Sequence, residues 1–326
     1  MKLYFRKLGF ISTWVAIVTV GVQSNVWAGN NQFERIFIFG DSLSDPGNVY
    51  ALLRATLPPP YTSQPPYEVI PSKPYDIDGF QFSDGKTWAQ WFARHLEMKK
   101  SGQAALNDPG VNGNYAFGGA RLRSLDPNDP TSATSQLNRF LGDYGGLVDP
   151  QALYVIQFGG NDVRDALGIL LLTGDIEAAG NVVKSAVETE VGMIFQLYQL
   201  GARHFLVANV PNISVTPAVK MFGSQGILAA NLLVGEYNNG LGGGLQSLQG
   251  LHGISINQLD LHAIVTAIVD DPKSFGIGNT EAPCLMFMIE TGAICSKSNK
   301  YLFWDGIHPT ARVHKIVSEH AARIYD

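Results

Sequence analysis

The stretch that decides the expected fold reads Ile36-Phe37-Ile38-Phe39-Gly40-Asp41-Ser42-Leu43-Ser44-Asp45. Its apolar run, with two β-branched residues, predicts a strand buried on both faces of a sheet. Gly40 ends this strand in a turn, which brings the hydroxyl of Ser42 to the carboxyl edge of the sheet. Open α/β sheets bind their ligands at that edge. The alternative interpretation is structural, because serine is also a favoured helix N-cap residue.

A second signal, Asp305-Gly306-Ile307-His308, lies near the other end of the chain. A serine hydroxyl is a poor nucleophile until an adjacent base takes its proton, and histidine is the usual base. An aspartate three residues before a histidine can fold back onto the imidazole and fix its tautomer. Ser42, Asp305 and His308 are therefore the candidate catalytic residues for acyl transfer. The alternative for His308 is an ordinary loop residue near a helix start.

Two further segments lie between these signals. They are Asn114-Tyr115-Ala116-Phe117-Gly118-Gly119-Ala120-Arg121 and, after the apolar run 153–158, Gly159-Gly160-Asn161-Asp162. In this order the four segments resemble the four blocks of the GDSL (SGNH) hydrolase family. The resemblance covers nearly all of residues 29–326. The chain looks like the exported lysophospholipase, lecithinase and haemolysin branch of that family, which is most familiar from bacteria.

The expected fold class is α/β. Five strands are expected near residues 35–39, 111–117, 153–158, 204–209 and 252–257. Helical patterns cover residues 84–96, 176–200, 228–248 and 309–324, and the alternation of strands and helices implies a parallel sheet. The resemblance implies a three-layer α/β/α sandwich with a central five-stranded parallel sheet in the flavodoxin-like order 2-1-3-4-5. Residues 29–326 are expected to form a single hydrolase domain.

The resemblance also implies an oxyanion hole. Its donors would be the backbone N–H groups of Ser42 and Gly119 and the side-chain amide of Asn161. Gly118 is an alternative position for the glycine donor, and Asn161 is alternatively a capping residue after the third strand. The neighbouring polar residues Asp41, Asp45, Asn48 and Asp162 are interpreted as structural, holding these turns by side-chain-to-backbone hydrogen bonds.

The first residues of the chain predict a signal peptide over residues 1–28. A basic start is followed by an apolar stretch, and Val26-Trp27-Ala28 offers a cleavage site after Ala28. A membrane anchor is the alternative interpretation, and no other segment is long and apolar enough to span a bilayer. A secreted or periplasmic protein, of bacterial origin by the resemblance, is expected. In such a compartment Cys284 and Cys295 most simply form one disulfide, with free thiols as the alternative.

Charge and motifs exclude several functions. The formal net charge of the 326-residue chain is −5, which disfavours nucleic acid as the main partner. Gly85-Lys86-Thr87 lacks the first glycine of a phosphate-binding loop, so no nucleotide is expected. No histidine pair has the spacing of a zinc site, and His314 and His320 are expected at the surface of the last helix. No metal or organic cofactor is predicted.

Two segments bear on the substrate. The proline-rich residues 56–79 either wall the substrate cleft or form a surface excursion. The apolar residues 285–294, between the cysteines, either contact a fatty chain or pack into the core. The leading hypothesis is a serine ester hydrolase of lysophospholipase or phospholipase A type, with acyl transfer to an alcohol and transient contact with a membrane surface. A carbohydrate or short-chain esterase and a catalytically silent binding protein are the alternatives.

Overall fold

The computed structural model describes residues 32–53, 63–64, 67–68, 71, 75, 79–123, 126, 128–286 and 293–326. The expected signal peptide, residues 1–28, lies outside these described residues. Residues Phe33–Asp326 form one unit, which contains every element discussed below. Within the described ranges, no helix combines the length and the apolar character that a membrane span requires.

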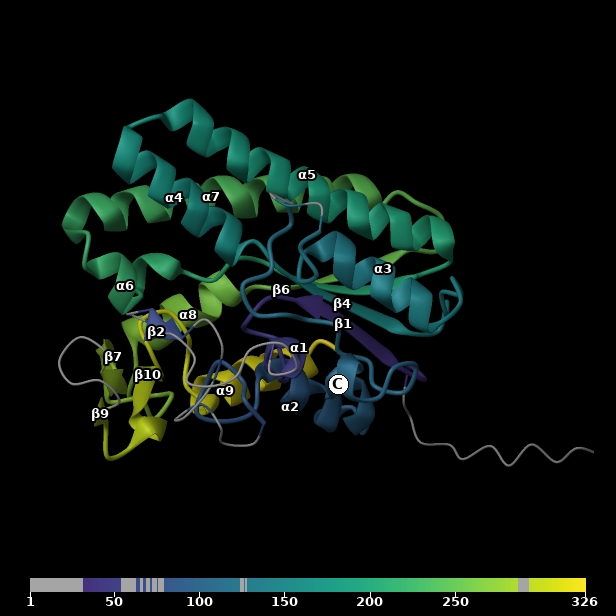
Figure 1. Ribbon diagram of the computed structural model, residues 1–326, viewed down its shortest axis with the longest axis horizontal. Helices are drawn as coiled ribbons and strands as arrows, with labels where there is room; N and C mark the ends of the chain where they lie inside the picture. The colour runs from purple at the N-terminus through teal and green to yellow at the C-terminus, as the bar shows by residue number, and fades with distance from the viewer. Residues whose placement is uncertain are drawn as a thin grey trace, which may run out of the picture. The chain divides into compact units, whose positions relative to one another are not determined.

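A parallel sheet of four strands forms the centre of the molecule (Figure 1). Its strands are β1 (Ile36–Gly40), β4 (Leu153–Gln157), β5 (His204–Ala208) and β6 (Ser255–Leu259), and they lie in the order β1-β4-β5-β6. Each neighbouring pair is parallel and in continuous register. The carboxyl ends of all these strands therefore meet at one edge, where the β1 strand delivers Ser42.

The prediction of a five-stranded sheet is wrong for one of the strands. Residues 111–117 run beside β1 and form an isolated parallel bridge, in which Asn114 pairs with Ile38. The Tyr115 N–H donates to the Ile38 carbonyl at 2.7 Å, as in a sheet. However, the Asn114 side chain accepts the N–H of Ala116 at 3.0 Å, a local turn that prevents a regular strand. The last strand also begins later than expected, at Ser255 rather than at residue 252.

Side chains alternate between two buried layers along each strand. Ile36 and Ile38 belong to one hydrophobic cluster, whereas Phe37 and Phe39 belong to another on the opposite face of the sheet. This alternation follows from the two-residue period of a strand. Both faces are covered, which explains why β1 is a continuous apolar run and not an alternating one.

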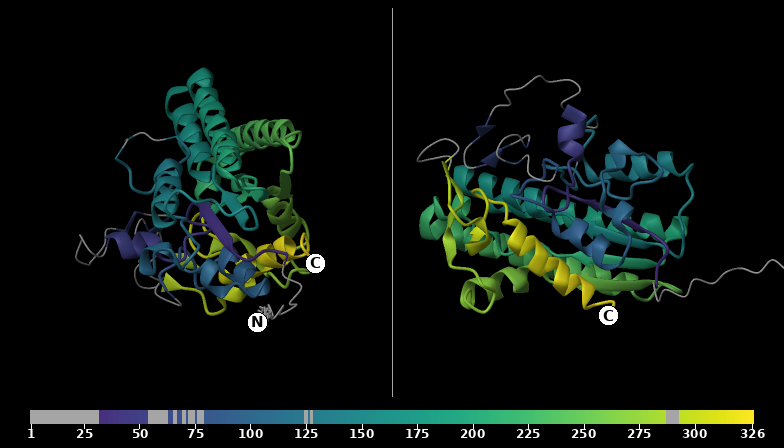
Figure 2. Two further views of the ribbon diagram at one scale, coloured as in Figure 1. Left: turned by 90° about the vertical axis from the view of Figure 1, so that its right-hand side faces the viewer. Right: turned by 90° about the horizontal axis from the view of Figure 1, so that it is seen from below.

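Helices cover both faces, so the fold has three layers (Figures 1 and 2). One face is covered by α3 (Ala133–Asp143), α4 (Gly160–Thr173), α5 (Ile176–Leu200) and α7 (Gly223–Leu248). The other face is covered by α2 (Trp88–His95), α8 (Leu261–Asp270) and α9 (Ala311–Ala322). The expected α/β/α arrangement is therefore present around a sheet of four strands.

Helix boundaries follow capping chemistry. Helix α2 begins after Thr87, whose hydroxyl and the Gln90 side chain form a capping box. The predicted start at residue 84 is therefore too early. Helix α5 has the predicted bounds and is capped by Asp175, whose side chain accepts the Ala178 N–H. Helix α7 is longer than predicted, because it also includes residues 223–227.

Shorter elements lie outside the central sheet and connect its strands and helices. They are the helices α1 (Asn48–Leu53) and α6 (Pro217–Lys220), the 3-10 turns at Lys99–Gly102, Ala105–Asn107, Ile213–Val215 and Ser298–Lys300, and the strands β2 (Ser63–Gln64), β3 (Tyr67–Glu68), β7 (Asn279–Pro283), β8 (Leu285–Met286), β9 (Ala293–Ile294) and β10 (Tyr301–Phe303). The predicted disulfide is present between Cys284 and Cys295, and it closes the β8–β9 hairpin. The described part of this hairpin packs on Trp304.

Candidate active site

The turn that carries Ser42 is held by buried polar groups. The Asp41 carboxylate accepts the Leu43 N–H at 3.0 Å and the Gln157 side-chain amide at 3.0 Å. Burial raises the pKa of Asp41, and these hydrogen bonds oppose that rise. The turn is thereby tied to β4, the strand beside β1, and the position of the Ser42 hydroxyl depends on rigid sheet residues.

Asp45 continues this support on the other side of Ser42. One of its carboxylate oxygens accepts the N–H groups of Gly47 and Asn48, at 2.7 and 2.6 Å. The other accepts the N–H of Gly118 at 2.8 Å and that of Val49 at 3.2 Å. Complete burial outweighs these bonds and raises the pKa of Asp45 to about 6. The predicted structural role of these turn residues is confirmed, and the Gly118 N–H is already engaged.

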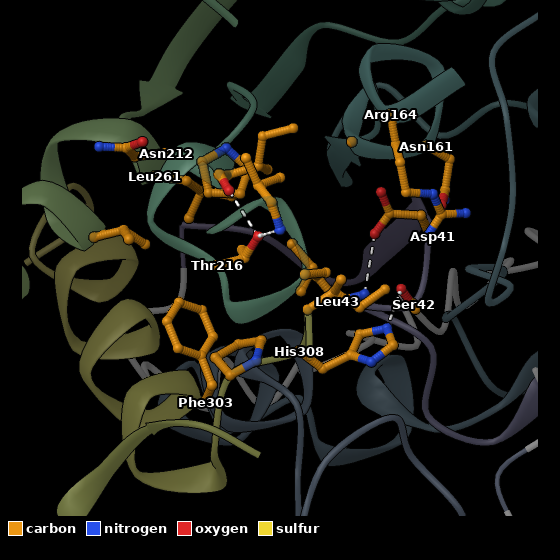
Figure 3. A pocket seen from close by; sticks show the side chains of 18 of the residues that line it. Asp41, Ser42, Leu43, Asn161, Arg164, Asn212, Thr216, Leu261, Phe303 and His308 are labelled. Carbon is orange, nitrogen blue, oxygen red and sulfur yellow. Dashed lines mark hydrogen bonds between the residues drawn. The ribbon is translucent and has the colours of Figure 1, made fainter. Parts of the chain in front are cut away.

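Ser42 and His308, from opposite ends of the chain, meet at the carboxyl edge (Figure 3), and Asp305 contacts His308 from behind. The Ser42 Oγ lies 2.9 Å from the His308 Nε2, although the two residues are 266 positions apart. The His308 Nδ1 lies 2.7 Å from an Asp305 carboxylate oxygen. All three side chains are buried or nearly so. The structure therefore brings the predicted candidates together in the order hydroxyl, imidazole, carboxylate.

The surroundings of Asp305 define the imidazole tautomer. Its Oδ1 accepts the backbone N–H groups of Ile307 and His308, at 2.9 and 2.7 Å. Its Oδ2 accepts the hydroxyl of Tyr75 at 2.7 Å, beside the His308 contact. A carboxylate surrounded by donors accepts from the imidazole as well, so Nδ1 carries the proton. The His308 Nε2 is then the acceptor of the Ser42 hydroxyl, 2.9 Å away.

Two aromatic residues at this site were not singled out from the sequence. Tyr75, from the proline-rich stretch, is fully buried and meets the Trp304 ring edge-on at 6.0 Å between centroids. Phe82 lies 5.1 Å, ring to ring, from His308. The tyrosines among the prolines were visible as a pattern, but nothing in the sequence distinguished Tyr75 from Tyr61 and Tyr67.

Of the expected oxyanion donors, Ser42 and Asn161 line one pocket. Gly119 has a φ of +77°, a backbone conformation that favours glycine. Asn161, in the first turn of α4, uses one amide hydrogen to bond the Ala120 carbonyl at 2.9 Å, so its second amide hydrogen remains for a substrate. Among the described residues, neither Ser42 nor Gly119 has an acceptor for its backbone N–H.

An ion-pair network fixes the Gly119 loop against α4. The Asp165 carboxylate accepts the side chains of Arg121 and Arg123, each at 2.6 Å. Asp162, one turn before it, accepts the Leu122 N–H at 3.1 Å, and burial raises the pKa of Asp162 to about 6. The expected structural role of Asp162 is confirmed. Since Asn161 and Gly119 lie on the two sides of this network, their relative positions are fixed.

A pocket of about 610 Å³ opens beside the Ser42–His308 pair (Figure 3). Its walls come from α4, α6, α8 and α9, and the residues are mainly aliphatic or aromatic, among them Leu167, Leu171, Val219, Leu261, Phe303 and Val313. A few polar groups interrupt these walls, among them Arg164, Asn212 and Thr216. Neither Leu285 nor Met286 lines it, and residues 287–292 of the hairpin lie outside the described part. This volume suits a ligand of moderate size with a long apolar portion.

No group of three or more histidine, cysteine, aspartate or glutamate side chains able to hold a metal ion occurs within the described ranges. A hydroxyl joined to an imidazole and a carboxylate, at the carboxyl edge of a parallel α/β sheet, is the arrangement used by the serine hydrolases.

Comparison with known proteins gives the family. Residues 36–321 match the model of the GDSL-like Lipase/Acylhydrolase family, and the chain belongs to that family of ester-cleaving hydrolases. It is 24% identical to a GDSL esterase/lipase of Arabidopsis thaliana, At1g29660, over 98% of this chain and 94% of that one. An acetylxylan esterase mutant from Geobacillus stearothermophilus superposes with a TM-score of 0.45 at 12% identity, over 89% of this chain and 92% of that one.

Two other relatives are longer than this chain. The anther-specific proline-rich protein APG of Arabidopsis thaliana is 23% identical over 89% of this chain. Lipase 1 of Photorhabdus luminescens is 22% identical over 94% of it. The matched regions span only 61% and 52% of the lengths of those two proteins. The family is thus established, whereas the lysophospholipase branch is a matter for proposal.

Proposed function

We propose that this protein hydrolyses fatty-acyl esters of lipids, in the manner of a lysophospholipase or phospholipase A, and can transfer the acyl group to an alcohol. The observation that carries this proposal is the apolar pocket that begins at Ser42 and His308. An acetylated sugar would leave such walls in contact with water or with unpaired hydroxyls, which is unfavourable. A long acyl chain would instead bury apolar surface there.

The proposed reaction starts at the serine hydroxyl. Ser42 Oγ attacks the ester carbonyl carbon while its proton passes to His308 Nε2. The Asp305 carboxylate, already oriented on Nδ1, stabilises the imidazolium. The proton then passes to the leaving alcohol as the ester bond breaks, which leaves an acyl group on Ser42. A water molecule, or a second alcohol, repeats these steps on the acyl-enzyme and releases an acid or a new ester.

Charge on the carbonyl oxygen is the main barrier to this attack. We assign its stabilisation to the N–H groups of Ser42 and Gly119 and to the Asn161 amide. The support for this assignment is that the Gly118 N–H is bonded to Asp45, whereas the two backbone N–H groups have no acceptor among the described residues. Preorganised donors of this kind each contribute roughly 3 kcal/mol to the transition state.

Export is part of the same proposal. We propose that residues 1–28 are removed as a signal peptide and that the protein acts in a bacterial periplasm or outside the cell. The Cys284–Cys295 disulfide fits an oxidising compartment. N-terminal sequencing of the protein recovered from the medium or periplasm tests this, with Gly29 as the expected first residue.

The test of function is a substrate panel with a labelling control. A fluorophosphonate probe should label the protein at Ser42, and Ser42→Ala or His308→Ala should lower turnover by about 10⁴-fold or more because the nucleophile or base is lost. Ser185→Ala, an exposed serine on α5, is the matched control and should retain full activity. Lysophosphatidylcholine, diacyl phospholipid, triglyceride and acetylated sugar are compared as substrates.

The outcomes separate the alternatives. Preference for the lysophospholipid or phospholipid supports the proposal. Preference for the acetylated sugar would replace it with a carbohydrate esterase, and a protein that neither labels nor turns over any ester would be a silent binding protein. Equal activity of wild type and Ser42→Ala would remove Ser42 as the nucleophile.

A further inference from the structure

The outer end of the apolar pocket is exposed to water. Leu172, Met221 and Phe222 line the same pocket as Ser42 and His308. Yet Leu172 is 87% exposed, and Met221 and Phe222 are each 60% exposed. We call these three residues the apolar rim. Single exposed apolar residues are ordinary on protein surfaces, but a group of large ones that continues an internal apolar wall is not.

The apolar rim comes from two separate parts of the fold. Leu172 lies in the last turn of α4, and Met221 and Phe222 join α6 to α7. These elements lie at the same end of the helical layer in Figure 1. A substrate chain that enters the pocket at this end passes between them toward His308. The rim and the reaction centre are therefore two ends of one apolar path.

The charges near the apolar rim indicate which surface it fits. Within residues 217–232 the one ionisable side chain is Lys220, which pairs with Glu281. The start of α5, next to Leu172, carries the acidic residues Asp175 and Glu177. A lipid surface with net negative charge would be repelled by these acids, and within residues 217–232 it would meet only Lys220, which is already paired. A zwitterionic surface requires only apolar insertion.

We propose that Leu172, Met221 and Phe222 dock the protein on zwitterionic lipid surfaces, so that an ester moves from the aggregate into the pocket without crossing water. This docking would deliver the ester for the proposed lipid hydrolysis, and its biological meaning rests on that proposed function. The proposed occupant of the rim is thus a lipid surface.

The experiment measures binding without turnover. The full chain carrying Ser42→Ala is mixed with phosphatidylcholine vesicles, and the bound fraction is read by flotation. Adding Leu172→Ser, Met221→Ser and Phe222→Ser together should weaken vesicle binding at least tenfold. The matched control is Leu147→Ser, because Leu147 is 78% exposed and lies before β4, at the opposite edge of the sheet. The control should bind as the parent does.

Several results would overturn the docking. Vesicle binding that is equal in the rim variant and the Leu147→Ser control is one, and binding that raised salt abolishes is another, since apolar insertion is not screened. A parent that is dimeric by light scattering, and that the rim variant makes monomeric, would assign the rim to self-association. Unchanged circular dichroism and Tm in the rim variant show that the fold is intact.

Failure of the docking is distinguishable from failure of the proposed function. If wild type hydrolyses lysophosphatidylcholine but the Ser42→Ala chain does not bind vesicles through the rim, the function stands and the docking is removed. If the Ser42→Ala chain binds vesicles through the rim but wild type hydrolyses only acetylated sugars, the docking surface stands and the lipid hydrolysis is removed.

Discussion

Two buried carboxyl groups in different layers of the molecule differ in the number of hydrogen bonds that they accept. Asp305, at the carboxyl edge of the sheet, accepts hydrogen bonds from Tyr75, Ile307 and His308. Glu190, between α5 and α7, accepts one hydrogen bond, from the Tyr237 hydroxyl. Its other oxygen has no partner within the described residues. Both side chains are fully buried, so the contrast lies in their donors.

The contrast shows what a buried charge requires. Burial raises the pKa of Glu190 to about 8, because one hydrogen bond does not replace the lost water. At neutral pH Glu190 is therefore a neutral acid that fills a gap between helices. Asp305 is surrounded by donors that suit an anion, and this is what the proposed imidazolium needs. The carboxylate at the site is surrounded by hydrogen-bond donors, whereas the carboxyl group between the helices has one donor and stays neutral.

The sharpest test of this contrast removes a donor where charge develops. Asn161→Ala should lower kcat by about 10²-fold or more, because the Asn161 amide would meet the oxyanion mainly in the transition state. KM should change little, and Tm should fall only slightly. Steady-state kinetics on one ester, with Asn128→Ala in an exposed loop as control, provide the measurement. A raised KM with unchanged kcat would remove Asn161 from the oxyanion hole.

A smaller effect is expected from removing the Tyr75 hydroxyl, because it donates to the Asp305 carboxylate and not to the oxyanion. Tyr75→Phe deletes the hydroxyl that Asp305 accepts at 2.7 Å, and kcat should fall about tenfold with KM unchanged, since hydrogen bonds to charged groups contribute about 1.5–3 kcal/mol. Tyr154→Phe is the control, because its hydroxyl donates to the Asp149 carbonyl at the other end of the sheet. Equal kcat values in the two variants would make Tyr75 merely structural.

Much of the site was predictable because short polar motifs directly follow strands that are recognisable as apolar runs. β1, β4 and β5 were expected within a residue or so, since each is a short apolar run. Their carboxyl ends fix where Ser42 and Asn161 lie. The Asp305–His308 turn was predictable from a spacing of three residues. Ser42 and Asn161 lie at one edge because their strands are parallel, whereas Asp305 and His308 follow β10, which belongs to a separate sheet.

The missed features depend on contacts between distant segments. Tyr75 gains its role only when its ring packs against Trp304, far away in the sequence. His314, expected at the surface, is buried and its Nδ1 accepts the backbone N–H of Trp88 at 3.1 Å; burial lowers its pKa to about 3. Neither contact leaves a local trace in the sequence, so periodicity could not reveal it.

The glycines of α7 illustrate the same limit. A helix was expected there over residues 228–248, although its glycines lower helix propensity. The helix is continuous through Gly240 and Gly244, which face α5. A Cβ at Gly244 would lie 2.4 Å from a Val191 methyl carbon, so the glycine allows the two helices to approach closely. Packing between α5 and α7 therefore outweighs the propensity of single residues.

The smallest effect on activity is expected at Glu190, the second carboxyl group of this comparison. The pKa of Glu190 in the folded protein, about 8, is above its ordinary value of 4.5, so between these pH values the folded state holds a proton that the unfolded state has lost. Stability contributed by that proton is complete below pH 4.5 and is lost as pH rises to about 8. Glu190→Gln cannot ionise, so its Tm relative to wild type should rise by a few degrees between pH 5 and pH 9, with kcat unchanged. Asp45 and Asp162 titrate in both proteins and cancel in the difference. Parallel Tm curves for the two proteins across this range would show that Glu190 keeps its charge in the fold, and the contrast with Asp305 would then fail.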